Sequence, residues 1–242
     1  MKQTILVTGP VKTRSGYGNH ARDICRALIE LDKYDVKINS VRWGTTPMNA
    51  LEDGNPHHEL IKSKLLTSPQ LPKQPDLHLH IVVPNEFTPV AKKNIGVTAG
   101  IETTVPVPQW IDGMNRMDLY LVTSELTKSS FENARFEFKD EKTGQEGEVK
   151  TVKPMKVLFE GVDTDEYFET TKMDTEITEV FSKIDTDWNF LFTGHWLQGG
   201  VGEDRKDLGM LVKIFCETFK NQKIQPGLIL KTSSASFSVL DR

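Results

Sequence analysis

The sequence predicts an α/β protein in which strands and helices alternate to build parallel sheets. Two observations predict it. Apolar runs of strand length alternate almost throughout the chain with segments whose apolar residues recur at helical spacing. Two glycine-rich turns, at residues 15–18 and 194–206, each lie between a predicted strand and a predicted helix. Because these turns are far apart in the sequence, we expect two α/β domains that face each other across a cleft.

The chain opens with a strand and a long amphipathic helix. The strand covers residues 4–8, and the helix runs from about Tyr17 to Leu31. A second strand over residues 36–41 alternates apolar and polar side chains. Residues 44–75 are rich in Pro, Asn, His and Gly, which predicts a loop with one short helix around residues 58–66. The apolar face of the first helix consists of Tyr17, Ala21, Ile24, Cys25 and Leu28.

The middle of the chain supplies the rest of the first sheet. Further strands are predicted at residues 77–83, 95–99, 119–123 and 157–159. Helices are predicted at residues 110–114 and 125–134. The segment 136–152 has period-two alternation around Thr143 and Gly144, which predicts an exposed hairpin inserted before the last, buried strand.

The character of the chain changes near residue 185. The polar, acidic residues 170–187 predict a linker that contains a helix. A new β-α-β unit follows, with a strand at 189–193, a helix at 207–219 and a strand at 228–231. A self-standing α/β domain takes on the order of 100 residues. We therefore expect one domain at residues 1–185 and an incomplete second domain at residues 186–242.

Composition excludes several classes of function. The net charge is −4 with Lys and Arg spread along the chain, so no basic stripe indicates a nucleic-acid partner. No apolar run is long enough to span a bilayer and no signal peptide is evident, which favours a cytoplasmic protein. Cys25 and Cys216 each lie on the apolar face of a predicted helix. We expect both to be buried structural thiols rather than catalytic or disulfide-bonded.

The first glycine turn has two readings. It matches neither G-x-G-x-x-G nor the P-loop pattern, so it is either a plain tight turn or a loop that faces a ligand. The second reading is favoured, because Gly16 and Gly18 would let a phosphate or a sugar approach the backbone. His20 lies one turn further on, although a lone histidine is more often a surface residue or one whose hydrogen bonds are satisfied.

His78 and His80 are predicted to share one face of the third strand. Such a pair can bind zinc, but no third cluster of ligands is evident nearby. We predict no metal site.

Two carboxylates follow predicted strands at their carboxyl ends, where α/β sheets place their ligands. Glu102 comes after the fourth strand and is suited to positioning a hydroxyl or stabilising a cation; equally, it caps a turn or pairs with a nearby cation. Glu160 follows the sixth strand, where a glycine turn leading into the linker is the favoured reading.

Arg205 and Lys206 carry the strongest local signal. They stand beside a glycine loop at the start of the helix predicted from residue 207. Cations at a helix N-terminus oppose the helix dipole unless an anion is present. Phosphate binding is therefore favoured over two merely solvated side chains.

Taken in order, four segments resemble the retaining glycosyltransferases of the family 4 type. The resemblance covers nearly the whole chain, and the ordered set is more specific than any one motif. It implies the glycosyltransferase B fold, with two Rossmann-like domains, the first binding the acceptor and the second the nucleotide-activated sugar. The segments are residues 15–22, residues 100–110, residues 121–124 with 157–163, and the stretch that ends at residues 205–208.

The resemblance also implies roles for particular residues. It puts Gly16, Tyr17 and Gly18 near the donor phosphates. It puts Lys206 on the diphosphate with Arg205 as a helper, and Glu102 near the reacting sugar or the acceptor. The chain departs from the family at His195, where many relatives carry an arginine, and the family's pair of donor-binding carboxylates falls beyond residue 242.

The expected function is transfer of a hexosyl group, with retention, from a nucleoside-diphosphate sugar to a hydroxyl acceptor on a glycan, lipid or protein. No cofactor and no metal are expected. One alternative is a dinucleotide-dependent, epimerase-like sugar-modifying enzyme, although its glycine fingerprint and Tyr-x-x-x-Lys pair are missing. Another is a non-catalytic module that binds a sugar or a nucleotide.

Overall fold

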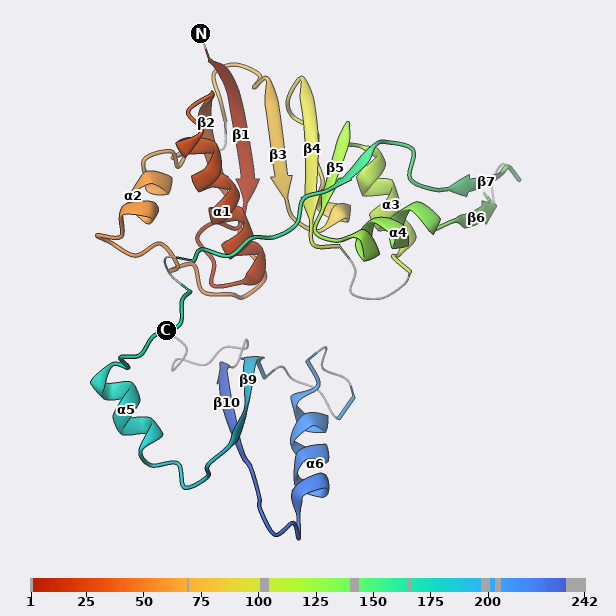
Figure 1. The fold of residues 1–242 in the computed structure, drawn as a ribbon. Helices are drawn as coiled ribbons and strands as arrows, with labels where there is room; N and C mark the ends of the chain where they lie inside the picture. The colour runs from red at the N-terminus through yellow and green to blue at the C-terminus, as the bar shows by residue number, and fades with distance from the viewer. Residues whose placement is uncertain are drawn as a thin grey trace. The chain divides into compact units, whose positions relative to one another are not determined.

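The computed structural model describes residues 2–68, 70–100, 105–139, 144–164, 167–196, 201–202 and 206–233 (Figure 1). The chain divides into two compact units, Met1–Gly161 and Val162–Arg242, each with its own parallel sheet. The sequence suggested a boundary after residue 185. The linker and helix α5 (Thr175–Phe181) lie between these two positions.

The first unit is a Rossmann-like α/β domain built on a six-stranded parallel sheet. The strand order is β2-β1-β3-β4-β5-β8, and every neighbouring pair is parallel. The predicted α/β class is thereby confirmed. The strands are β1 (Gln3–Gly9), β2 (Tyr34–Ser40), β3 (Leu77–Ile81), β4 (Lys93–Thr98), β5 (Leu119–Val122) and β8 (Met155–Val157).

The order of the strands reverses at β1. The chain passes from β1 to β2 on one side, and then returns to place β3 on the other side of β1. Ligands of open α/β sheets bind outside the carboxyl ends of the strands at such a reversal. The carboxyl edge of this sheet is therefore the first place to look for a site.

Helices lie beside the first strands and beside the last strands of the sheet. Figure 1 shows α1 beside β1 and β2, and α3 and α4 near β5. Pro begins α2 and α3, where its missing N–H costs no hydrogen bond. The helical elements are α1 (Gly16–Glu30), α2 (Pro56–Lys62), the short 3₁₀ helix η1 (Pro84–Glu86), α3 (Pro108–Asn115) and α4 (Glu125–Asn133).

The two faces of the sheet bury different side chains. On the α1 face, Val7 packs with Ala21 and Cys25 in an almost wholly aliphatic cluster. The other face buries a second apolar cluster around Tyr120 and Phe131, where α3 and α4 lie. That second face also buries polar groups over β1, β3 and β4, namely Thr8, His78, His80, Asn94 and Thr98.

The two cysteines differ in environment. Cys25 is buried as predicted, and burial raises the pKa of its thiol to about 12. Cys216 is exposed, so its predicted burial is wrong. The packed face of its helix runs through Leu208, Phe215 and Phe219, and Cys216 is rotated away from that face.

The end of the first unit differs from expectation at one strand. The hairpin is confirmed as antiparallel β6 (Phe136–Lys139) and β7 (Glu146–Val149). The sixth strand of the sheet, however, is β8 (Met155–Val157), and Phe159 is 81% exposed rather than buried. The reason is that β8 pairs only with β5 and leaves the sheet after the Leu158 N–H donates to the Val122 carbonyl.

The second unit contains the predicted β-α-β motif. Strands β9 (Asn189–His195) and β10 (Gly227–Ser233) are parallel, and α6 (Leu208–Phe219) connects them. Phe190 of β9 packs against Phe215 and Phe219 of α6, with ring centroids 5.9 and 5.7 Å away. Aromatic packing thus holds the helix against its sheet.

The buried imidazoles should make stability depend on pH. Burial, aided by neighbouring His80, lowers the pKa of His78 to about 3, and burial lowers the pKa of His80 to about 4. Both values lie below the unfolded value of about 6.5, so the unfolded chain binds more protons between about pH 4 and 6.5. Stability should therefore fall as pH drops through this window, by up to ~1.4 kcal/mol per pH unit for each histidine.

Urea unfolding between pH 4.5 and 6.5 measures this slope. We expect His78→Gln and His80→Gln each to make it shallower, whereas His57→Gln, at an exposed imidazole, leaves it unchanged. Equal slopes in all four proteins would show that the two imidazoles are solvated in the folded chain.

Candidate functional site

The segments that follow β1, β4 and β8 meet at the carboxyl edge of the first sheet. Helix α1 joins them, because side chains of its first two turns contact the ends of β4 and β8. Tyr17 reaches Thr98, and His20 reaches Glu160. Parallel strands bring their carboxyl ends to one edge, which is why residues this far apart in sequence are neighbours here.

The turn before α1 is held by its own side chains. Ser15 is the N-cap, and its hydroxyl accepts the Gly18 N–H at 3.0 Å. The Ser15 hydroxyl lies 2.8 Å from the hydroxyl of Thr13, which donates to the Pro10 carbonyl at 2.8 Å. The loop between β1 and α1 is therefore tied to the first turn of the helix.

Gly16 and Gly18 have different reasons to be glycine. A Cβ on Gly18 would overlap the carbonyl oxygen of Thr13 and lie 2.7 Å from its hydroxyl, so the fold itself demands glycine there. Gly16 is exposed, and a Cβ on it would meet nothing within 4 Å. Of the two, only Gly16 borders open space in which a ligand can approach the backbone.

Two backbone donors remain at this helix end. Within the described part of the chain, no acceptor takes the N–H of Gly16 or of Tyr17. Both belong to the first turn of α1, where the aligned peptide dipoles favour an anion. The turn can thus offer two N–H groups to a negatively charged group.

Arg22 stabilises the same loop, and the sequence analysis missed it. Its guanidinium donates to the carbonyls of Val11 and Thr13, each at 2.9 Å. The signal in the sequence was an arginine on the second turn of a helix that follows a glycine loop. Because Arg22 binds the carbonyl groups of the loop, the N–H groups of the loop can point in another direction.

Tyr17 anchors α1 to the end of β4. Its hydroxyl lies 2.9 Å from the Thr98 hydroxyl and accepts the Ala99 N–H at 3.1 Å. Its ring stacks on Trp43 with centroids 4.2 Å apart, and burial raises the pKa of the phenol. The side chain is therefore committed to the protein, and the backbone N–H is the group that Tyr17 offers to a ligand.

His20 and Glu160 form a pair that the sequence treated separately. His20 Nδ1 lies 3.5 Å from a Glu160 carboxylate oxygen, and His20 Nε2 is buried with no hydrogen-bond partner among the described residues. Burial lowers the pKa of His20, against the opposing pull of Glu160, and so favours the neutral imidazole. A neutral imidazole beside a carboxylate can accept a proton at its second nitrogen.

Two predicted site residues, Glu102 and Arg205, lie outside the described residues. Gly100, which precedes Glu102 by two positions, follows β4 at the carboxyl edge, and its N–H donates to the Thr98 hydroxyl at 3.1 Å.

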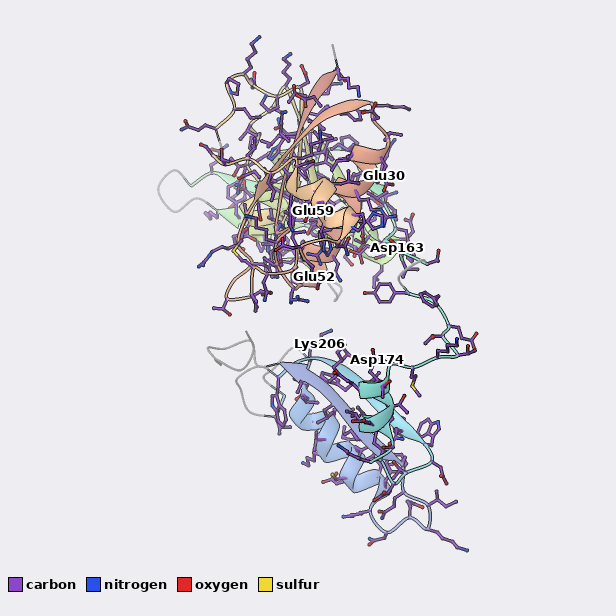
Figure 2. All side chains as sticks on the ribbon, turned by 90° about the vertical axis from the view of Figure 1, so that its left-hand side faces the viewer. Glu30, Glu52, Glu59, Asp163, Asp174 and Lys206 are labelled. Carbon is purple, nitrogen blue, oxygen red and sulfur yellow. The ribbon has the colours of Figure 1, made fainter. Side chains whose placement is uncertain are left out.

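Lys206 lies where β9 gives way to α6. A Cβ built on Gly194 would be 3.9 Å from Lys206 Cγ, so the lysine stem passes beside the end of the strand. Figure 2 shows Lys206 at the end of this unit where α6 begins. Gly194 and the stem of Lys206 are therefore neighbours, whereas most of the second glycine loop lies outside the described residues.

An internal anion caps α6. Asp207, in a left-handed backbone conformation with φ 44°, accepts the Met210 N–H at 3.4 Å and the Gly202 N–H at 2.9 Å. Cations such as Arg205 and Lys206 oppose the dipole at a helix N-terminus unless an anion is present. The carboxylate of Asp207 supplies that negative charge. An external phosphate would be held by side-chain cations more than by the helix end.

Among the described residues, no three His, Cys, Asp or Glu side chains gather in a way that suits a metal ion. Within the same residues, no helix is both long and apolar enough to cross a membrane. No protein-family model matches the chain, and no curated protein matches it either.

The two glycines of the first turn make a matched pair of variants. We expect Gly18→Ala to lower the free energy of unfolding by about 2 kcal/mol, because the added methyl overlaps the Thr13 carbonyl. Gly16→Ala should leave stability unchanged or raise it by up to ~1 kcal/mol, since alanine is the better helix former in open space. Urea unfolding measures both, and a destabilised Gly16→Ala would mean that Gly16 is structural.

Proposed function

We propose that this chain is a glycosyltransferase of the B type that moves a hexosyl group from a nucleoside-diphosphate sugar to a hydroxyl acceptor, with retention. The observation that carries the proposal is the placement of Lys206 beside Gly194, where a parallel strand leads into a helix. The order of the motifs along the chain supports it, because each lies at or near the carboxyl end of a strand.

The proposed sugar transfer requires positive charge close to the diphosphate that leaves the sugar. Bond cleavage leaves negative charge on that group, and preorganised donors stabilise it. We assign this role to the side-chain cations of Lys206 and Arg205, both in the second unit. With two cations in this role, the reaction needs neither a metal nor a cofactor.

The two units divide the substrates. We assign the acceptor, a hydroxyl of a glycan, a lipid or a protein, to the first unit, and the nucleotide of the donor to the second. Glu102 follows β4 and is assigned to positioning the reacting sugar or acceptor hydroxyl. Gly18 is the necessary partner of the Thr13 loop, so its role in donor binding is indirect.

Calorimetric titration with UDP, GDP and ADP tests the diphosphate assignment. We expect one of them to bind, and Lys206→Ala to weaken its affinity at least tenfold, because a charge-assisted hydrogen bond is worth about 1.5–3 kcal/mol. The Arg205→Ala/Lys206→Ala double variant should weaken it further. Lys220→Ala, at the opposite end of α6, is the matched control and should bind as the unaltered chain does. Equal affinity in all variants would mean that the diphosphate does not bind at this end of α6.

Glu102→Gln tests the catalytic assignment. The change keeps the shape of the side chain and removes its charge, so transfer and hydrolysis of the donor should fall at least tenfold while the melting temperature stays the same. Product formation from labelled nucleotide sugars measures it. A variant that melts at a lower temperature but turns over normally per folded molecule would make Glu102 a structural residue.

A further inference from the structure

A cavity lies on the polar face of the first sheet, away from α1 and from the carboxyl-edge residues assigned above. Its volume is about 550 Å³, within the range of small-molecule sites. Strands β1, β2 and β3 form its floor, and two coil segments form its walls. The coil segments are joined where the Gln74 side chain donates to the Val90 carbonyl at 3.4 Å. Its main lining residues are Leu6, Thr8, Asn39, His78, His80 and Lys73.

The floor of the cavity is polar where a sheet face would ordinarily be apolar. Thr8, His78 and His80 have exposures of 7%, 2% and 8%, so little of each side chain is accessible to solvent. The same strands place Val7, Ile38 and Leu79 on the opposite face, in the aliphatic core. Burying polar side chains costs free energy unless they find hydrogen-bond partners. A ligand that supplies partners would offset that cost.

Several hydrogen-bonding groups of the floor are left without protein partners. The Thr88 N–H donates to His80 Nδ1 at 3.2 Å, which leaves the proton of neutral His80 on Nε2 as a donor. His78 Nε2 pairs with the Thr8 hydroxyl at 2.9 Å, and His78 Nδ1 is buried with no hydrogen-bond partner among the described residues. The Asn39 side-chain amide has no partner among the described residues. The floor thus offers both donors and acceptors.

The lining is neutral apart from its rim. Burial keeps both imidazoles uncharged at pH 7, because the pKa of His78 falls to about 3 and that of His80 to about 4. Among the described lining residues only Lys73 carries a charge, and it is exposed. Leu6, Leu71 and Val90 add apolar surface. This lining is unsuited to a phosphate, whose charges need several cations or N–H groups.

We propose that this cavity binds a neutral polyhydroxylated molecule of monosaccharide size. Such a ligand carries hydroxyls that both donate and accept, and C–H faces that pack on aliphatic side chains. The Asn39 amide and the His80 Nε2–H are the groups that recognise its hydroxyls. The site is distinct from the proposed diphosphate contacts and does not depend on the glycosyltransferase assignment.

Saturation-transfer NMR tests the proposal with glucose, galactose, mannose and N-acetylglucosamine, each added to the full chain. We expect at least one to give a signal at millimolar concentration. Asn39→Leu keeps the size of the side chain but removes the amide, and it should lower the affinity of that sugar about tenfold. Because Asn39 is only half-buried, this change leaves the packed core untouched. Thr8→Val is the second variant, with the shape retained and the hydroxyl removed.

The controls separate this site from the proposed diphosphate contacts. His57→Gln, at an exposed histidine of α2, should retain the sugar signal, as should Lys206→Ala. Asn39→Leu should in turn leave nucleoside-diphosphate affinity unchanged. The proposal is overturned if no sugar of the panel binds, if Asn39→Leu and Thr8→Val bind it as well as the unaltered chain, or if inorganic phosphate displaces it. Melting curves of each variant confirm that it is folded.

Discussion

The carbonyl of Thr13 packs against the first turn of α1, and this contact governs the carboxyl edge of the first sheet. Only glycine at position 18 leaves room for it. Ser15 caps the helix from one side of the loop, and Arg22 binds the loop's carbonyls from the other. With α1 fixed in this way, Tyr17 reaches the end of β4 and His20 reaches Glu160. The site is thus a consequence of how one loop folds back on a helix.

One face of the sheet mainly stabilises the fold, and the other face carries the proposed sugar site. The α1 face is aliphatic and contributes apolar burial, which is the main source of folding free energy. The opposite face combines an apolar cluster under α3 and α4 with a polar floor near β1 and β3. Burying polar groups costs free energy, so a concentration of them in one region indicates a functional role. The Rossmann-like domain therefore has candidate binding groups on one face of its sheet as well as at the carboxyl edge.

The two helix N-termini are satisfied to different degrees. In α6 the Asp207 carboxylate already accepts backbone N–H groups, whereas in α1 the Ser15 hydroxyl takes one N–H and leaves those of Gly16 and Tyr17. An anion at the start of α1 would therefore meet backbone donors, whereas an anion at the start of α6 would meet side-chain cations.

The sequence by itself determined most of the elements, because strand and helix patterns are local: they predicted the strands of both sheets, except for the position of β8, and the amphipathic face of α1. It failed at Phe159 and Cys216, since apolar character says what a residue prefers and not whether a neighbour covers it. It identified His20 and Glu160 separately, and His78 with His80 as a pair on one strand face, but the contacts of His20 with Glu160 and of His78 with Thr8 depend on the strand order. Only the tertiary structure decided those contacts, because hydrogen bonds and close packing join atoms that the order β2-β1-β3-β4-β5-β8 brings together from distant parts of the chain.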